Sequence, residues 1–316
     1  MRIGALEPPH IPSLRRFLIF GFMLAALLGG CTPAWVKPEP IEQVGLMEAA
    51  LSRTQEDVTV TVAVPTRDQT TRLFGTSLYN NRIQPVWVNI DNRSEKPYVM
   101  MKVGIDNDLY SPLEAAYQRH SGSAEVRMEM DLFFHEMGFE NPVLPGEVTS
   151  GFVFTNLEEG FKPVNIDLVS DQGLLHYSFI VKVPGLVTDI DQIDLDSIYD
   201  ELVYIEEEEE LKRVLESLPC CTTNKKGDQF GDPLNVVFIG NRAEMLSALI
   251  RRGWHQTEIT HKSSAWKTVK SFLFGSQYRY SPISPLYVFG RSQDLGMQKA
   301  RHTIHLRNHM RVWRTP

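Results

Sequence analysis

The sequence is poor in cysteine and lacks the motifs of nucleotide-binding and metal enzymes. It has three cysteines, Cys31, Cys220 and Cys221, which excludes a framework of several disulfides. Neither a GxGxxG nor a Walker pattern is present, and no complete set of histidine and cysteine ligands stands at metal-site spacing. We therefore expect no cofactor and no metal, and no complete catalytic motif indicates an enzyme.

Long apolar runs are also scarce. After Cys31, no apolar run approaches the roughly 18 residues of a membrane-spanning helix, so we expect the rest of the chain to be soluble. The run before it, Phe17–Leu28, has 12 residues and follows Arg15 and Arg16. It is too short for a hydrocarbon core roughly 30 Å thick, so the pattern predicts a signal peptide over residues 1–30.

The apolar run ends in Leu28-Gly29-Gly30-Cys31, which resembles the lipobox of bacterial lipoproteins. In that family the cysteine thiol takes diacylglycerol, the chain is cut before the cysteine, and the new amino terminus is acylated. The resemblance implies a cell-envelope lipoprotein, anchored by palmitate or similar chains on Cys31. Thr32 favours the outer membrane, facing the periplasm, if the source has two membranes, and export argues against nucleic acid as a partner.

Charge is unevenly distributed along the chain. Residues 32–231 contain 16 Lys and Arg against 34 Asp and Glu, a balance of −18, whereas residues 232–316 contain 13 against 4, a balance of +9. The two halves either dock on each other, or the basic half faces an anionic partner such as lipid headgroups or phosphates.

Period-two alternation dominates the acidic half and predicts short strands. Turn residues separate several of them, and seven or eight strands predict an antiparallel sandwich with an immunoglobulin-like plan over residues 57–186, a binding or spacer domain. The expected strands are Val58–Val64, Arg72–Tyr79, Gln84–Asp91, Tyr98–Val103, Arg127–Phe134, Thr149–Thr155, Val164–Val169 and Leu174–Val183.

The segments around these strands have simpler predictions. Prolines suit residues 31–56 to an extended tether, within which residues 44–51 predict a short amphipathic helix. Residues 111–123 predict a short helix or an inserted loop. His120 and His135 stand alone and are more typical of surface or core residues than of ligands.

The junction between the halves is acidic and ends in two adjacent cysteines. Pro184-Gly185 closes the last strand, so we place the C-terminal domain at residues 187–316. Glu207–Leu218 predicts a helix that Pro219 ends. Cys220 and Cys221 either form a disulfide, take part in redox or soft-metal chemistry, or stand as two poorly reactive thiols in a turn.

The basic half contains a predicted strand, turn and helix. Asn235–Ile239 is an apolar run typical of a buried strand, and Asn241 with Glu244 predicts a helix cap directly after it. The helix N-terminus offers free N–H groups to an anion at Gly240 and Asn241. A further helix is predicted over Ser264–Phe274 and a short strand over Leu286–Phe289.

The last segment, residues 301–314, alternates as a strand does. His305, Arg307, His309 and Arg311 share one face, which suits an anion because guanidinium groups grip phosphate and imidazole moves protons near neutral pH. Arg291 is a further candidate for the same ligand. If the protein is an enzyme, His305 or His309 serves as acid or base and Asp294 orients a histidine.

Several motifs in the second half resemble the LssY C-terminal domain family. They are Leu218–Thr223, Gly231–Val237, Ser281–Leu295 and His309–Arg314. The resemblance covers roughly residues 189–316 and implies a domain of unestablished biochemical role, often joined to membrane proteins of the lipid-phosphatase or DedA type. This chain lacks the signatures of those phosphatases, so only membrane association carries over. Together with the expected sandwich, it predicts an α+β multidomain chain that ends in a mixed α/β LssY-like domain.

Three functions follow from these features. The preferred one is an envelope lipoprotein whose basic domain binds an anionic, phosphate-bearing ligand such as a lipid or a cell-wall precursor. The second is a hydrolase of phosphate esters or lipids that uses His305, Arg307, His309 and Arg311, although no nucleophile stands in a recognisable setting. The third is a structural or assembly role with envelope proteins as partners.

Overall fold

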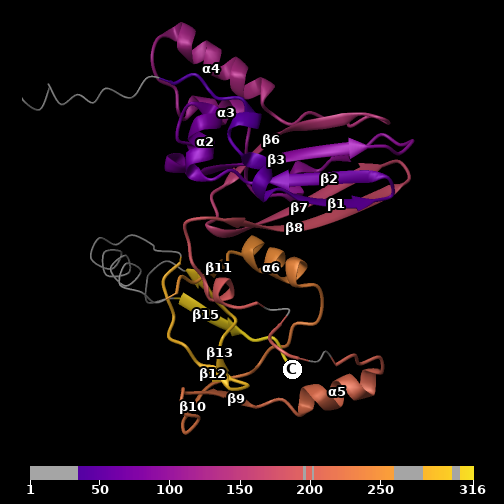
Figure 1. Ribbon diagram of the computed structural model, residues 1–316, viewed down its shortest axis with the longest axis vertical. Coiled ribbons are helices and arrows are strands. Elements are labelled where there is room, and N and C mark those ends of the chain that lie inside the picture. The colour runs from indigo at the N-terminus through magenta and orange to yellow at the C-terminus, as the bar shows by residue number, and fades with distance from the viewer. Residues whose placement is uncertain (1–34, 195–196, 201–202, 260–279, 301–306) are drawn as a thin grey trace, which may run out of the picture.

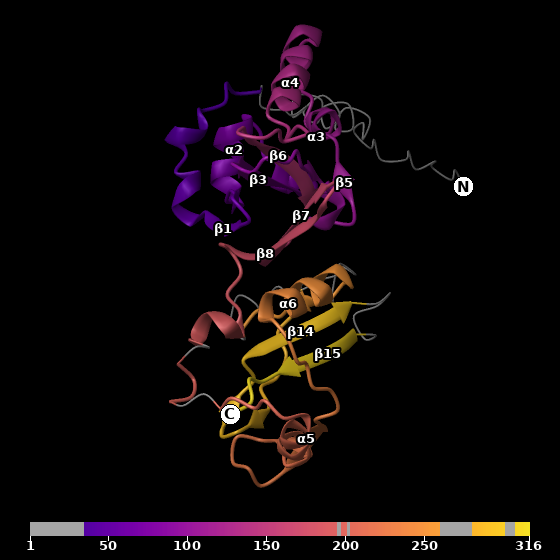
Figure 2. The same cartoon turned by 90° about the vertical axis from the view of Figure 1, so that its right-hand side faces the viewer.

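The computed structural model describes residues 35–194, 197–200, 203–259, 280–300 and 307–316. Over these residues the chain is mixed, mostly β-sheet with a few helices, and two units follow one another along its long axis (Figures 1 and 2). We call residues 35–183 the N-terminal unit and the residues from 187 onward the C-terminal unit.

Two antiparallel sheets form the N-terminal unit. The larger contains β1 (Leu51–Gln55), β2 (Val58–Ala63), β3 (Ile83–Asn92), β6 (Val148–Asn156) and β5 (Leu109–Tyr110), in the order β1-β2-β3-β6-β5. The smaller contains β4 (Val99–Met100), β7 (Gly160–Ser170) and β8 (Gly173–Val183), in the order β4-β7-β8. Each strand pair runs antiparallel.

One apolar core lies between these sheets. Alternate side chains of β2, such as Val58 and Val60, and of β7, such as Val164 and Ile166, are fully buried and belong to a single cluster. Successive side chains of a strand point to opposite faces, so the period-two pattern in the sequence reports this burial directly. The predicted strands at residues 58–64, 84–91, 149–155, 164–169 and 174–183 are confirmed, whereas only Val99–Met100 of residues 98–103 is a strand.

A second apolar cluster lies between the larger sheet and three helices. The helices are α2 (Arg67–Phe74), α3 (Pro112–Tyr117) and α4 (Ala124–Glu136). Phe74 lies at its centre, with ring centroids 5.1 Å from both Phe134 and Phe152. The larger sheet is therefore covered on both faces.

Two predicted strands are wrong, because residues 72–79 and 127–134 are largely helical. Residues 72–79 end α2 and enter the short 3-10 helix η3 (Leu78–Asn81), and residues 127–134 lie within α4. Helix α2 starts with a capping box in which Thr66 and Gln69 satisfy each other's backbone N–H groups. In α4, Met130 and Phe134 are buried at a spacing of four, which is the period of a helix and not of a strand.

The predicted tether is also corrected in its described part. Trp35 donates its Nε1 hydrogen to the Phe74 carbonyl oxygen at 2.7 Å, and Glu39 pairs with Arg72 at 2.7 Å. The helix expected at residues 44–51 is replaced by η2 (Leu46–Ala49), which follows η1 (Ile41–Gln43), and by the start of β1. From Trp35 onward the chain therefore packs on the N-terminal unit.

The described residues of the C-terminal unit form two small sheets and two α-helices. One sheet has β9 (Cys221–Thr223), β10 (Phe230–Pro233), β12 (Tyr287–Val288) and β13 (Arg291–Ser292), in the order β10-β9-β12-β13. The other has β11 (His255–Gln256), β14 (Leu295–Ala300) and β15 (Arg307–Val312), in the order β11-β14-β15. Helix α6 (Arg242–Arg251) packs on β14 through Leu246 and Ile250. Helix α5 (Glu208–Glu216) confirms the helix predicted at residues 207–218.

One strand predicted in this unit is wrong, although the helix after it is confirmed. Asn235–Ile239 has no ladder partner among the described residues, and Val236 and Ile239 are 64% and 71% exposed. Asn241 caps α6 by accepting the backbone N–H of Ala243 at 2.8 Å. The predicted helix at residues 264–274 and the first part of the predicted strand at 301–314 lie outside the described residues.

The two units contact each other through α6, β7 and β8. Asn165 of β7 donates its Nδ2 hydrogen to Ser247 Oγ of α6 at 2.6 Å, and both residues are buried. Ile180 of β8 also packs against the α6 core. The acidic and basic halves of the chain therefore contact each other, as one of the two explanations of their opposite charges predicts. Neutral groups make much of this contact.

Candidate binding cleft between the two units

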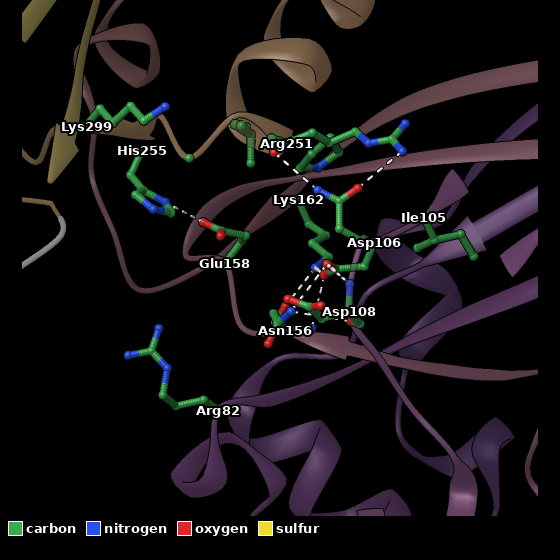
Figure 3. Close-up of a pocket in the computed structure, with 14 residues that line it drawn as sticks. Arg82, Ile105, Asp106, Asp108, Asn156, Glu158, Lys162, Arg251, His255 and Lys299 are labelled. Atoms are coloured by element: carbon green, nitrogen blue, oxygen red, sulfur yellow. Dashed lines mark hydrogen bonds and ion pairs between the residues drawn. The ribbon is translucent and has the colours of Figure 1, made fainter. Parts of the chain in front are cut away.

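A cleft of about 390 Å³ lies between the two units. The 105–108 loop, the β6–β7 connection and β7 form one side, while the end of α6, β11 and β14 form the other. Figure 3 shows Arg82, Asp106 and Lys162 on the side of the N-terminal unit and His255 and Lys299 on the side of the C-terminal unit. Charged side chains therefore dominate the walls.

Lys162 provides a buried ammonium group in the wall. Its side chain is 2% exposed, and Nζ donates to Asp106 Oδ2 at 3.0 Å and to the Asn156 carbonyl oxygen at 2.7 Å. Asp106 is fixed in turn, because Oδ2 accepts the Asn156 backbone N–H at 3.0 Å. An ammonium has three donors, and the described residues take two of them. The third N–H has no acceptor among the described residues.

Glu158 and His255 join the two units at another part of the cleft. His255 Nδ1 lies 3.1 Å from Glu158 Oε2, and the side chains are 11% and 14% exposed. The Tyr280 ring packs edge-on against His255 at 5.9 Å, and the Tyr280 hydroxyl accepts the Glu159 backbone N–H at 3.1 Å. The Glu158 backbone N–H donates to Gln84 Oε1 at 3.0 Å, which fixes the carboxylate side of the pair.

Three further cations line the cleft. Among the described residues, the side chains of Arg82, Arg251 and Lys299 have no carboxylate partner, and Arg251 Nη2 reaches only the neutral Asn107 Oδ1 at 3.4 Å. Asp108 supplies an exposed carboxylate to the same lining. After Lys162 is matched with Asp106 and His255 with Glu158, cations exceed carboxylates, so the cleft suits an anionic group.

The residues predicted on the last strand are only partly brought together. His305 lies outside the described residues, while Arg307, His309 and Arg311 share one face of β15. Arg311 is already engaged, because Nη1 donates to Asp232 Oδ2 at 2.9 Å and Nη2 to the Ser284 carbonyl oxygen at 2.9 Å.

Of the remaining two residues of that face, Arg307 is half-buried and His309 is exposed. Arg307 Nη1 donates to Gln298 Oε1 at 3.0 Å, while its buried Nε has no partner among the described residues. Burial lowers the pKa of Arg307 from its usual value. Burial also lowers the pKa of His309, with smaller contributions in the same direction from Arg311 and Arg307.

Asp294 and Arg291 are partners of each other. Arg291 Nη1 donates to Asp294 Oδ1, and Arg291 Nη2 donates to the Tyr199 hydroxyl at 3.0 Å. Asp294 Oδ2 accepts the Arg314 backbone N–H at 2.6 Å. Asp294 therefore orients the Arg291 side chain and the backbone at Arg314. It does not make the predicted contact with His309.

A second, larger groove of about 1200 Å³ collects several of the predicted residues. Asn241 uses its side chain to cap α6, and Gly240 precedes it with φ of 144° and open space around it. The exposed segment Val236–Ile239 forms part of the wall. Asp294, His309 and Arg311 also line this groove, whereas Arg291 and Arg307 do not.

Of the alternatives for the adjacent cysteines, the structure has the disulfide. Cys220 and Cys221 are joined at the start of β9, and Cys220 lines the larger groove. Cys31 lies outside the described residues. Among those residues, no group of three or more histidine, cysteine or acidic side chains gathers as a metal site requires.

A comparison with protein families finds a match in the last third of the chain. The family model described as LssY C-terminus matches residues 211–316. These residues form an LssY-like C-terminal domain. The match begins later than the expected residue 189 and includes α6, both small sheets and most of α5. The comparisons with curated proteins and with solved structures gave no match. No described helix is long and apolar enough to cross a membrane.

No sequence pattern predicts the cleft. Its C-terminal wall belongs to the LssY-like domain, through Arg251, His255 and Lys299, and its other wall belongs to the N-terminal unit. These residues are far apart in the sequence and form no motif. A weak signal existed in Lys162, a lone cation in a strand that is otherwise largely buried.

Proposed function

We propose that this chain is an exported lipoprotein that binds a small anionic, phosphate-bearing ligand in the cleft between its N-terminal unit and its LssY-like domain. The observation that carries the proposal is the set of cations in the cleft. Lys162 has a donor to spare, and Arg82 and Lys299 have no carboxylate partner among the described residues. Charge-assisted hydrogen bonds from such groups are the strong ones in anion recognition.

The cleft supports binding better than the face of β15 does. Arg311 on that face is held by Asp232 and Ser284, and the lowered pKa of His309 reflects burial and neighbouring arginines that disfavour the imidazolium. A hydrolase mechanism there needs a histidine oriented by Asp294, which instead pairs with Arg291. Binding without turnover is therefore the proposal.

We infer that the N-terminal unit is an immunoglobulin-like module. Constant-type immunoglobulin sandwiches pair strands A-B-E-D in one sheet and C-F-G in the other. The orders β2-β3-β6-β5 and β4-β7-β8 follow the same sequence of pairings, with β1 added at the edge of the larger sheet. The helices enter as insertions, α2 between β2 and β3, and α3 with α4 between β5 and β6. Such modules present ligands or act as spacers.

Membrane attachment through Cys31 is the other part of the proposal. It rests on the 12-residue apolar run, on its length relative to a bilayer, and on the lipobox-like Leu28–Cys31. Mass spectrometry of the mature N-terminal peptide tests it. A peptide that begins at a diacylglyceryl-modified Cys31 supports the anchor, whereas retention of Met1 without fatty acid contradicts it.

Ligand binding is tested by titrating the protein with inorganic phosphate and glycerol phosphate in a calorimeter. The Arg82→Gln, Lys299→Gln double variant should bind at least tenfold more weakly, which at roughly 1.4 kcal/mol per decade is a modest loss for two charged contacts. Arg252→Gln is the matched control, since Arg252 lies beside Arg251 at the end of α6 but does not line the cleft. Equal affinity in all three proteins would refute the cleft as the site.

A further inference from the structure

The two units lie at different positions along the long axis of the molecule. Both views place α3 and α4 at one end of that axis, followed by the two sheets, and then the C-terminal unit with α5 at the other end, where Figure 1 also shows β9 and β10 (Figures 1 and 2). The two views differ by a rotation about this axis, so the order is the same in both.

The first described residues are fixed at the helical end. Trp35 donates to the Phe74 carbonyl oxygen at 2.7 Å, and its ring lies 5.9 Å from that of Phe133 on α4. The Val36 backbone N–H donates to the Gly75 carbonyl oxygen at 3.3 Å. The chain therefore joins the N-terminal unit beside α2 and α4.

The proposed lipid attachment site is close to this point in the sequence. Cys31 precedes Trp35 by four residues. Four residues span at most about 14 Å even when fully extended. If acyl chains on Cys31 insert into a bilayer, they hold the helical end of the molecule within that reach of the headgroups.

The same end carries exposed apolar side chains. Met128 and Leu132, one helical turn apart on α4, are 63% and 58% exposed. Leu113 and Tyr117, with the same spacing on α3, are 51% and 73% exposed. Residues four apart on a helix lie on one face, so each pair forms an exposed apolar stripe, in which the Tyr117 ring also contacts His120 at 5.3 Å. Removing such area from water is favourable, by roughly 25 cal/mol per Å².

The charges of this end indicate what kind of surface fits it. Within residues 112–136 the acidic side chains outnumber the two arginines, Arg119 and Arg127. Anionic lipid headgroups would be repelled by this excess. A zwitterionic lipid surface does not repel these acidic side chains, so the exposed apolar side chains of α3 and α4 can contact it. The acidic side chains are Glu114, Glu125, Glu129, Asp131 and Glu136.

We propose that the α3–α4 end rests on the zwitterionic lipid surface that receives the Cys31 anchor. The inference depends on the proposed lipid anchor and adds an orientation to it. The LssY-like domain and the cleft are then held away from the anchoring bilayer by the sheets of the N-terminal unit. The cleft ligand consequently comes from the aqueous compartment or from an opposing surface, and not from the headgroups around the anchor.

Fluorescence quenching in liposomes tests the orientation. The mature lipidated chain is reconstituted in phosphatidylcholine vesicles that carry a headgroup spin label, with a fluorophore attached through Leu132→Cys or Lys225→Cys. Leu132 lies on α4, and Lys225 lies in the exposed turn between β9 and β10 at the opposite end. An apolar helix face penetrates an interface by roughly 5–10 Å, so quenching at position 132 should be at least twofold and that at position 225 close to zero.

The outcomes separate the orientation from the anchor. Flotation with stronger quenching at position 225, or with none at either position, overturns the orientation and leaves the anchor standing. Failure to float overturns both. A Met128→Glu, Leu132→Glu variant checks the contact independently of any label: limited proteolysis at α4 should be slow in the liposome-bound wild type and faster in the variant, and equal rates would count against the proposal. Both side chains are exposed, so folding should be unaffected.

Discussion

Glu158 and His255 face each other across the boundary between the two units, with Oε2 and Nδ1 3.1 Å apart. Gln84 fixes the backbone on one side and Tyr280 packs against the ring on the other. The pair thus ties the β6–β7 connection to β11 beside the proposed ligand cleft. Its geometry makes the docking of the two units, and not either unit alone, responsible for the shape of the cleft.

Replacing His255 with alanine should destabilise the docked arrangement. The carboxylate of Glu158 loses a mostly buried partner, which costs about 1.5–3 kcal/mol in the free energy of unfolding. Urea denaturation followed by intrinsic fluorescence measures the change. His176→Ala is the control, because His176 also pairs with a carboxylate, Asp167, at 2.6 Å but is 45% exposed, so its loss should cost under about 0.5 kcal/mol. Similar losses in the two variants would contradict the structural role of His255.

Lys162→Met should lower the free energy of unfolding more than His255→Ala does. Removing the ammonium leaves the Asp106 carboxylate, 16% exposed, without its ion partner, and breaking such a pair costs about 3 kcal/mol. The double variant Lys162→Met, Asp106→Asn removes both charges, so it should recover part of the loss. Chemical denaturation of the wild type, the single variant and the double variant gives the three values. A single variant as stable as the wild type would show that the pair is not closed in solution.

Sequence patterns predicted local structure well where a single force decides it. The alternation in β2 and β7 is direct evidence of one buried face, and Asn241 caps α6 as its position before Ala243 and Glu244 requires. The same reasoning failed at residues 72–79 and 127–134. Phe74 and Phe134 in these segments belong to an aromatic cluster between the helices and the larger sheet. A short apolar stretch is compatible with the period of a helix and with that of a strand, so the pattern alone does not distinguish them.

The cleft was beyond prediction for a different reason. Arg82 has a left-handed backbone conformation at φ of 62°, Lys162 lies on a buried strand, and Lys299 lies near the end of β14. No local rule links these residues, and only the docking of two units brings them together. The described part of the predicted face, which contains Arg307, His309 and Arg311, has the alternation of a strand, but the sequence could not show that Asp232 and Ser284 bind the Arg311 side chain.

Ile239→Lys distinguishes the exposed segment from the buried strand that the sequence suggested. Ile239 is 71% exposed, so the substitution should change the free energy of unfolding by less than about 0.5 kcal/mol. Met297→Lys on β14 is the comparison, because Met297 is fully buried and a charge there should cost at least about 3 kcal/mol. Thermal and urea unfolding measure both. A large loss for Ile239→Lys would mean that residues 235–239 are buried in solution.

Acidification should weaken the fold through His309. Burial, helped by Arg311 and Arg307, lowers the pKa of His309 below its ordinary 6.5 in the folded chain. Between that lowered pKa and 6.5 the unfolded chain binds more protons than the folded one, so stability falls as the pH drops through this window and levels off below it. His309→Gln should reduce the slope of unfolding free energy against pH, measured in urea between pH 5 and 7.5. An unchanged slope would show that the pKa of His309 is not lowered in the folded chain.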